Sequence, residues 1–380
     1  MGIQLFVPTF NIERCMEEIR ECLEKGWTGL GYKTVEFEEK WKDYTNHSHA
    51  HFLCSATAGL HLAVKVFKMK YGWTETDEII STPMTFVSTN HAIAYENMKI
   101  KFADVDEFLC LEPDSVRKQI TKNTKAIIFV GVGGNTGNYE EILSICRENN
   151  LILILDAAHM AGTRLNGKTP GLKADCTVYS FQAVKNLPTA DSGMICFNEE
   201  ADDEVCRKLT WLGINKDTYA RTNEKGNYKW KYDVEYLGYK YHGNSIMAGI
   251  GIAQLETLDK DNAYRRQICT WYDNKFRDIK EIKIIPIAQG CESSRHLYII
   301  EVDERDVLLE FLNKNEVFPG VHYRDNTDYG MYAYGKQACK NSTRLSERII
   351  SLPLHLRLSK KDVDYVADKV IEYVLKNKSN

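Results

Sequence analysis

The sequence contains no long hydrophobic run: nowhere among its 380 residues do 18 apolar residues follow one another. A helix that crosses a bilayer needs about 20 such residues, so we expect no membrane-spanning segment. The first residues, MGIQLFVPTF, lack the basic stretch and apolar core of a secretion signal, and Phe6 departs from the myristoylation pattern after Gly2. These absences predict a protein that is neither secreted nor bound to a membrane.

Paired cysteines are also absent: the eleven cysteines are scattered singly, without one C-x-x-C pair, and their number is odd. This usage is typical of buried thiols in a reducing compartment and predicts a cytoplasmic protein. Basic residues are not in excess either, because 49 Lys and Arg stand against 53 Asp and Glu, for a formal net charge of -4. A surface that binds nucleic acid needs clustered positive charge, so we expect no nucleic-acid partner.

Repeats and low-complexity segments are missing too, and 43% apolar with 27% charged residues is the balance of an ordinary globular protein. The chain is longer than a single hydrophobic core usually supports, so we expect two domains. The larger would span residues 1–255 and the smaller residues 256–380. A helix over residues 245–276 would be long enough to bridge them.

From about residue 50 onward, short apolar runs alternate with amphipathic segments. Strands are expected at residues 50–54, 77–82, 99–105, 126–132, 151–158, 176–181 and 192–198, and helices at 59–71 and 138–150. Alternation of this kind predicts right-handed crossovers, and therefore an α/β protein whose mainly parallel sheet is covered by helices on both faces.

The segments that flank this sheet are expected to be helical at first and mixed at the end. A helix near the N-terminus is indicated by apolar residues at helical spacing: Ile12, Met16, Ile19 and Leu23. Strands at 283–287 and 296–302 and helices at 307–315 and 361–376 predict a compact C-terminal α+β domain. The polar segment over residues 216–233 is expected to be a mobile loop.

Asp156 ends the apolar strand LILILD, and His159 follows three residues later. Open α/β sheets bind ligands at the carboxyl edge of their strands. A carboxylate there can keep a pyridine nitrogen protonated, which turns the ring into an electron sink. The D-x-x-H spacing alone leaves a second hypothesis open, in which Asp156 caps the turn and His159 packs in the core.

The next loop carries Ser180 and Lys185 between two apolar segments. A lysine beside a buried strand edge is partly desolvated, which lowers its pKa and supplies the neutral amine that imine formation requires. Taken alone, a loop lysine is more often a solvated surface charge.

Residues 55–57, with the sequence SAT, lie where a strand passes into a helix. The free backbone N–H groups of a helix N-terminus bind phosphate, although Ser or Thr in this place is also an ordinary helix cap. Phe86 follows another strand and can either stack on a flat ring or pack in the core.

Taken in order, five segments resemble the sugar aminotransferases of the DegT/DnrJ/EryC1/StrS family: SATAGLHLA, TPMTFVSTNHAI, ILDAAHMAG, YSFQAVKNLPTADSGM and YLGYKYHGNSIMAGIGIAQL. The similarity extends to GWTGLGYKTVEFEEKW near the N-terminus and to LSERIISLPLHLRLSKKDV near the C-terminus, so it covers nearly the whole chain. It implies the fold type I of these enzymes, with a mainly parallel seven-stranded sheet in the large domain and a smaller C-terminal α+β domain.

The resemblance also implies a cofactor and a role for each matched residue. Pyridoxal 5'-phosphate (PLP), with pyridoxamine phosphate (PMP) as the intermediate, would be bound through Lys185 as a Schiff base. Asp156 would pair with the pyridinium nitrogen, and Phe86 would stack over the ring. The phosphate would be held by Ala56, Thr57 and Ser180.

His159 would lie beside the cofactor, and His322 and Tyr323 would approach the substrates from the small domain. The enzyme would be a homodimer in which Lys240 reaches the cofactor phosphate of the partner subunit, at a position where many family members have asparagine. His242 replaces the usual arginine of the same motif, and FVGVGGNTGN lacks a histidine that often follows this strand. The substrate pocket is therefore expected to differ from that of other members.

The implied reaction moves an amino group from L-glutamate to a keto group of a nucleotide-linked 4-keto (or 3-keto) 6-deoxysugar. A keto-cyclitol acceptor and a non-catalytic protein with an inherited fold are the alternatives. A sugar 3-dehydratase is disfavoured, because such enzymes have histidine where this chain has Lys185. No metal site is expected, since no Cys or carboxylate ligands accompany the nearby histidines His47, His49 and His51.

Overall fold

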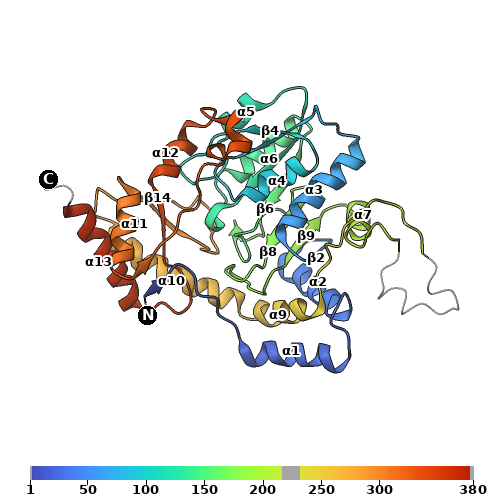
Figure 1. Cartoon of the computed structure of the whole chain (residues 1–380), viewed down its shortest axis with the longest axis horizontal. Helices are drawn as coiled ribbons and strands as arrows, with labels where there is room; N and C mark the ends of the chain where they lie inside the picture. Colours follow the sequence, from blue (N-terminus) through green and yellow to red (C-terminus); the bar gives the residue numbers. More distant parts are fainter. Residues whose placement is uncertain (1, 216–231, 377–380) are drawn as a thin grey trace.

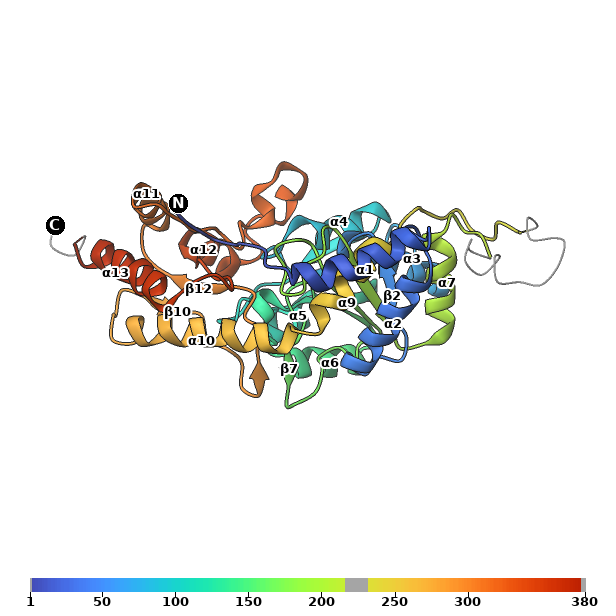
Figure 2. The same cartoon turned by 90° about the horizontal axis from the view of Figure 1, so that it is seen from below.

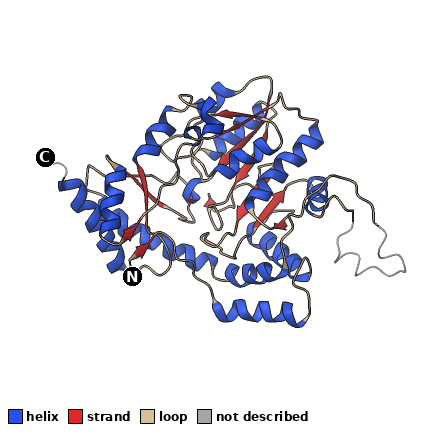
Figure 3. Ribbon diagram, in the orientation of Figure 1, coloured by secondary structure: helices blue, strands red, loops and turns tan. Residues whose placement is uncertain are grey.

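The computed structural model describes residues 2–215 and 232–376. Its largest feature is a seven-stranded sheet, whose strands are drawn in red in Figure 3. The order of the strands is β2-β9-β8-β6-β5-β3-β4. The strands are β2 (His51–Leu53), β3 (Glu78–Ser81), β4 (Lys99–Phe102), β5 (Thr124–Val130), β6 (Ile152–Asp156), β8 (Cys176–Ser180) and β9 (Gly193–Phe197). Strands β8, β6, β5, β3 and β4 are parallel, whereas β9 runs antiparallel to both β8 and β2. The predicted α/β fold with a mainly parallel sheet is confirmed.

Helices cover both faces of this sheet (Figure 1). One face carries α2 (Tyr32–Thr45), α5 (Pro113–Gln119), α6 (Tyr139–Glu148) and α9 (Ser245–Leu255), and the other carries α3 (Ala56–Tyr71), α4 (Val87–Tyr95) and α7 (Glu200–Thr210). Strand β6 contributes Leu153 and Leu155 to the core under the first set and Ile154 to the core under the second. A strand that is apolar throughout is therefore buried on both sides, as parallel strands are.

Helix α1 (Ile12–Glu24) confirms the helix expected near the N-terminus, but its apolar residues face outward. Ile12 is 68% exposed and Leu23 61% exposed, whereas Cys15, Glu18 and Cys22 are buried. The buried side packs on α9, where the absence of a side chain at Gly249 leaves room for Glu18. The charge of Glu18 is compensated by the buried Lys33, whose Nζ lies 2.5 Å from its carboxylate.

The single helix expected over residues 245–276 is wrong in one respect, because it is broken into α9 and α10 (Leu258–Phe276). The break lies at Thr257, whose hydroxyl donates to the Asp261 carboxylate (2.9 Å) at the start of α10. Helix α10 then runs from the large sheet towards the C-terminal part (Figure 2). Leu258 packs in the large core and Phe276 in the C-terminal core, so we propose that the domain boundary lies at this break, beside the expected 255/256.

The C-terminal part is built on a three-stranded antiparallel sheet of order β10-β12-β14. Its elements are β10 (Lys283–Ile284), β12 (Tyr298–Glu301), α11 (Arg305–Lys314), α12 (Lys340–Arg348), β14 (Ile349–Leu352) and α13 (Lys360–Lys376). Short strand pairs join β1 (Ile3–Gln4) to β13 (Val317–Phe318) and β7 (Arg164–Leu165) to β11 (Cys291–Glu292). Three 3-10 turns are η1 (Val132–Gly134), η2 (Asn326–Asp328) and η3 (Gly330–Gly335).

Within the two described ranges, no helix is long and apolar enough to cross a membrane. The segment expected to be a mobile loop, 216–233, falls almost wholly outside these ranges, since residues 216–231 are not described.

Candidate active site

A cavity of about 720 Å³ opens at the carboxyl edge of the sheet, where β5, β6 and β8 end and α3 and α4 begin. Ligands bind at this edge in open α/β sheets because loops and helix N-termini converge there. Nine of the ten residues predicted from the sequence line the cavity: Ala56, Thr57, Phe86, Asp156, His159, Ser180, Lys185, His322 and Tyr323. The tenth, Lys240, does not line the cavity of its own chain, and its Nζ lies 3.1 Å from the centre of the Trp211 ring.

Asp156 is the buried carboxylate of this cavity, at the last position of β6. Its Oδ2 accepts a hydrogen bond from the Thr89 hydroxyl (2.8 Å), and its Oδ1 accepts one from the Ala158 amide (3.1 Å). Burial raises the pKa of Asp156, while these two hydrogen bonds and the charge of Lys185 oppose the rise. The hydrogen bonds hold the carboxylate in one orientation, so a cationic ligand group facing it meets an acceptor already in place.

Thr89 was missed by the reasoning from sequence. It lies on α4, four positions after Thr85, which precedes the helix, and the two hydroxyl oxygens are 2.9 Å apart. The T-x-x-x-T spacing at a helix start was visible in the sequence, but its partner Asp156 is 67 residues further along the chain.

Lys185 is carried by a tight loop between β8 and β9. The backbone of this loop is closed by hydrogen bonds from Ala183 to Ala190 (2.8 Å) and from Thr189 to Phe181 (2.8 Å). Burial lowers the pKa of Lys185 to about 8, against the attraction of Asp156 for the charged form. An amine with this pKa is neutral in a much larger fraction near pH 7 than an exposed lysine, as reaction with an aldehyde requires.

The loop is anchored by the residue that follows Lys185. The Asn186 side-chain amide donates to the Ser294 carbonyl and to the Asn262 side-chain oxygen, each at 2.7 Å. Asn262 belongs to α10, so the position of Lys185 depends on the helix that links the two parts of the chain.

The N-terminus of α3 points its free amide groups towards the same cavity. Ser55 caps the helix by accepting a hydrogen bond from the Ala58 amide (3.1 Å), and Ala56 and Thr57 line the cavity. Gly193 on β9 makes this approach possible, because a Cβ there would lie 2.6 Å from the Ala56 amide nitrogen. Hydroxyl and amide side chains complete this end of the cavity: Ser180, Gln182 and Ser192.

His159 has a defined tautomer. The Gly133 amide donates to Nδ1 of His159 (3.1 Å), so the ring proton is on Nε2, which lies 3.0 Å from the Tyr323 phenol oxygen. Burial, followed by the charge of Lys185, lowers the pKa of His159 well below its ordinary value, so the ring is neutral. The phenol of Tyr323 therefore accepts from His159 and keeps its own proton for another acceptor.

Two cations line the cavity among the described residues, Lys185 and Arg324. Arg324 was not singled out from the sequence. Its guanidinium group lies 5.2 Å from the Tyr329 ring centre and 3.5 Å from the Asp328 carboxylate. His322, two positions earlier in the chain, is neutral because burial and then Lys185 lower its pKa to about 4.

Together, these groups fit PLP. The cavity offers an amine for the aldehyde, a buried carboxylate for the pyridine nitrogen, and a helix N-terminus with hydroxyl groups for the phosphate. A parallel sheet that carries these groups on successive strand ends is the architecture of a fold type I PLP-dependent enzyme.

The chain belongs to the DegT/DnrJ/EryC1/StrS aminotransferase family, which it matches over residues 11–371. It is 32% identical to "Uncharacterized protein MJ1066" of Methanocaldococcus jannaschii, with 98% of this chain and 99% of that protein covered. It is 30% identical to the spore coat polysaccharide biosynthesis protein SpsC of Bacillus subtilis, with 94% of each chain covered.

Among solved structures, Spr1654 of Streptococcus pneumoniae is similar in both its PLP form and its PMP form. The PLP form is 26% identical with a TM-score of 0.90 and 99% of each chain covered. The PMP form is 27% identical with a TM-score of 0.91, covering 99% of this chain and 100% of the other. The protein is thus a PLP-dependent aminotransferase, and PMP is the intermediate form of its cofactor.

Proposed function

We propose that this aminotransferase moves an amino group from L-glutamate to the keto group of a nucleotide-linked 4-keto or 3-keto 6-deoxysugar. The observation that carries the proposal is the joint placement of Lys185 and Asp156 in one cavity of about 720 Å³. That volume lies in the upper half of the range of about 300–1,000 Å³ that is usual for ligand pockets, which supports an acceptor larger than an amino acid. The involvement of SpsC in polysaccharide biosynthesis supports a sugar as this acceptor.

PLP supplies an electron sink for the carbanion that forms when the donor loses its α-proton. Asp156 would keep the pyridine nitrogen protonated, because a buried carboxylate favours a neighbouring cation. Lys185 would hold the cofactor until the amino group of the donor displaces it, and its free amine would then take the proton from the donor α-carbon. In the second half-reaction, the same amine would return a proton to the carbon that accepts the amino group.

The remaining cofactor contacts follow from the cavity wall. Phe86, which is 59% exposed with its ring centre 6.3 Å from that of Tyr323, would stack on the pyridine ring. His159 would lie beside the cofactor as a neutral donor to Tyr323. The phosphate would be held by Ala56, Thr57 and Ser180.

Both substrates are anionic, so the cavity must also hold negative charge. Lys185 is consumed by the chemistry, which leaves Arg324 as the permanent cation among the described lining residues. We propose that Arg324 binds the carboxylate of the donor and the diphosphate of the acceptor in turn. Tyr323 would donate its free phenol proton to a substrate oxygen, and His322, fixed by the Ser351 hydroxyl (2.9 Å), would shape the wall beside it.

We further propose a homodimer with shared active sites. The exposed apolar stripe of α1, formed by Ile12, Met16 and Leu23, is an interface candidate on an otherwise polar helix. Lys240 lies outside the cavity of its own chain, so a role at a cofactor phosphate requires the cavity of the partner subunit.

A reducing compartment, the cytoplasm, is the proposed location. All eleven cysteines are described, and none of them forms a disulfide.

The test is an absorbance spectrum of the purified protein with PLP, before and after addition of L-glutamate, repeated on Lys185→Ala. The native protein should show the band of lysine-bound PLP, glutamate should convert it to the PMP spectrum, and the variant should show neither. A nucleotide-linked 4-keto 6-deoxysugar should then restore the first spectrum. Restoration by a keto-inositol instead would replace the sugar proposal with the cyclitol alternative, and no response to glutamate would reject the proposed donor.

A further inference from the structure

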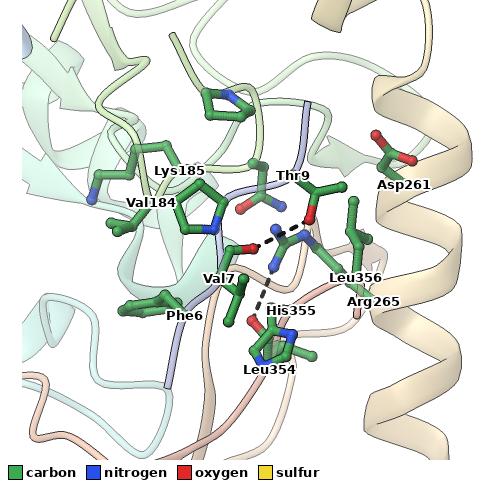
Figure 4. A pocket seen from close by; sticks show the side chains of 13 residues that line it. Phe6, Val7, Thr9, Val184, Lys185, Asp261, Arg265, Leu354, His355 and Leu356 are labelled. Carbon is green, nitrogen blue, oxygen red and sulfur yellow. Dashed lines mark hydrogen bonds between the residues drawn. The ribbon is translucent and has the colours of Figure 1, made fainter. Parts of the chain in front are cut away.

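A second, much smaller cavity lies on the other side of the lysine loop (Figure 4). Four segments line it: residues 6–9, residues 184–188, residues 354–356 and the first turns of α10. Its volume of about 10 Å³ corresponds to one water-sized particle. Arg265 of α10 reaches into it, while Figure 4 shows the amine of Lys185 directed away from Arg265. Lys185 also lines the larger cavity.

Arg265 is a buried cation without a carboxylate partner. It is 6% exposed, and its Nη1 donates to the Leu354 carbonyl (3.2 Å). No Asp or Glu in the described ranges lies within 4 Å of its guanidinium group, and its buried Nε has no hydrogen-bond acceptor there. Burial lowers the pKa of Arg265 to about 10, against the opposing effects of Asp261 and then Cys269, so its charge is only partly compensated.

The other two buried Lys and Arg side chains of the described ranges are compensated. Lys33 contacts the carboxylates of Glu18, Glu21 and Glu36, and Arg305 contacts that of Asp306. A buried charge without a partner costs several kcal/mol, which is why such groups are paired in folded proteins. Among the described residues, Arg265 is therefore the buried cation that no carboxylate contacts directly, and Asp261 compensates its charge only in part.

His355 supplies a second unmatched donor to the same cavity wall. Its Nδ1 accepts a hydrogen bond from the Arg357 amide (3.3 Å), so the ring proton is on Nε2. That nitrogen is buried and makes no hydrogen bond of ordinary geometry within the described chain, although the Gln4 backbone is close enough to raise the pKa of the ring. Burial, and then the charge of Arg265, lowers the pKa of His355 to about 4 against the effect of the Gln4 backbone, so the ring is a neutral donor.

The remaining polar groups of the cavity wall do not accept hydrogen bonds from Nε of Arg265 or Nε2 of His355. The Val7 carbonyl accepts a hydrogen bond from the Thr9 hydroxyl (3.3 Å), and the Leu354 carbonyl already accepts from Arg265. Asp261 lines the cavity as well, and its charge raises the pKa of Arg265, but its carboxylate accepts from the Thr257 hydroxyl (2.9 Å) and makes no direct ion pair with Arg265. A water molecule could accept the two hydrogen bonds, yet it would leave the positive charge buried and only partly compensated.

We propose that this cavity is a binding site for one monatomic monovalent anion, physiologically chloride, held by Nε of Arg265 and Nε2 of His355. The volume of about 10 Å³ excludes a carboxylate or a phosphate. The site is separate from the substrate cavity and does not depend on the proposed acceptor. By neutralising Arg265, the bound anion would stabilise the packing of residues 6–9, 184–188 and 354–356 against α10.

The direct test is a crystal of the PLP-bound enzyme soaked in sodium bromide, with the anomalous signal of bromine measured. An anomalous peak in contact with Arg265 and His355 supports the site, whereas density for a water without an anomalous signal overturns it. Because soaking uses high concentrations, the second test is thermal unfolding in sodium chloride against sodium gluconate at equal ionic strength. Chloride should raise the Tm by a few degrees along a saturable curve; equal Tm values in both salts would overturn the proposal.

Variants separate this site from general salt effects. Arg265→Met should lose the chloride dependence, while the matched control Arg305→Met, which removes a buried arginine that has a carboxylate partner, should keep it. His355→Phe leaves the charge of Arg265 in place and removes the Nε2–H donor, so it should weaken the apparent chloride affinity about tenfold. If Arg265→Met does not fold, the bromide signal and the chloride dependence of the Tm of the native enzyme still decide whether the cavity binds a halide ion.

Discussion

The phenol oxygen of Tyr323 lies 3.0 Å from Nε2 of His159, although the two residues are 164 positions apart in the chain. The Gly133 amide occupies the other nitrogen of the same ring, so the direction of the hydrogen bond is determined: His159 donates and Tyr323 accepts. The proton of Tyr323 is then free for a ligand. This pair connects the end of β6 to the segment that follows β13 across the cavity.

Replacing Tyr323 with phenylalanine should therefore lower both stability and activity. The buried Nε2–H of His159 loses its acceptor, which costs about 1–3 kcal/mol of unfolding free energy. The loss of one hydrogen bond to the substrate should lower kcat/KM about tenfold. Steady-state kinetics and chemical denaturation measure the two effects, with Tyr334→Phe, an exposed position outside the cavity wall, as the control. Unchanged kinetics in Tyr323→Phe would contradict its role at the substrate.

The attachment of PLP to the apoenzyme should become faster as the pH rises through about 8. Below this pH the Lys185 amine is protonated and cannot react, and above it the amine is neutral, since burial lowers its pKa from 10.5 to about 8. Stopped-flow absorbance of the band of lysine-bound PLP gives the rate. Asp156→Ala should move the midpoint to lower pH, because the carboxylate stabilises the charged amine. A midpoint near 10 would mean that Lys185 is not desolvated in solution.

Gly193→Ala should weaken PLP binding while the fold is kept. The added Cβ would lie 2.6 Å from the Ala56 amide nitrogen and 2.8 Å from the Tyr179 carbonyl, so the N-terminus of α3 must move. We expect the Kd for PLP to rise about tenfold or more, measured by absorbance titration of the apoenzyme. Gly29→Ala is the matched control, because a Cβ there meets no atom within 4 Å. Equal PLP affinity in the two variants would show that α3 does not hold the phosphate.

Arg324→Gln should raise the KM of both substrates, by about tenfold each, with a smaller effect on kcat. The variant removes the permanent cation of the described cavity wall while keeping a polar side chain of similar length. Lys336→Gln is the control, since Lys336 also faces the Asp328 carboxylate (3.8 Å) but does not line the cavity. A KM increase for only one substrate would restrict Arg324 to that half-reaction.

The sequence by itself determined the fold class and the position of most candidate site residues. Asp156 and Ser180 end strands, and Ser55 begins a helix, so local patterns were enough to place them at one edge of a parallel sheet. Lys185 could be placed at the same edge of the sheet, because it lies in the short loop that follows the buried strand β8. Periodicity and strand ends are encoded by neighbouring residues, and they can be recognised without knowing the rest of the structure.

Only the tertiary structure decided the contacts between distant segments. The side-chain donor to Asp156 is Thr89, the side-chain partner of His159 is Tyr323, and no carboxylate of the described residues contacts Arg265 directly. The same holds for α1, where Ile12, Met16 and Leu23 are exposed while the charged Glu18 is buried beside Lys33. Packing, charge compensation and hydrogen-bond direction are properties of groups that the fold brings together, so no local pattern in the chain records them.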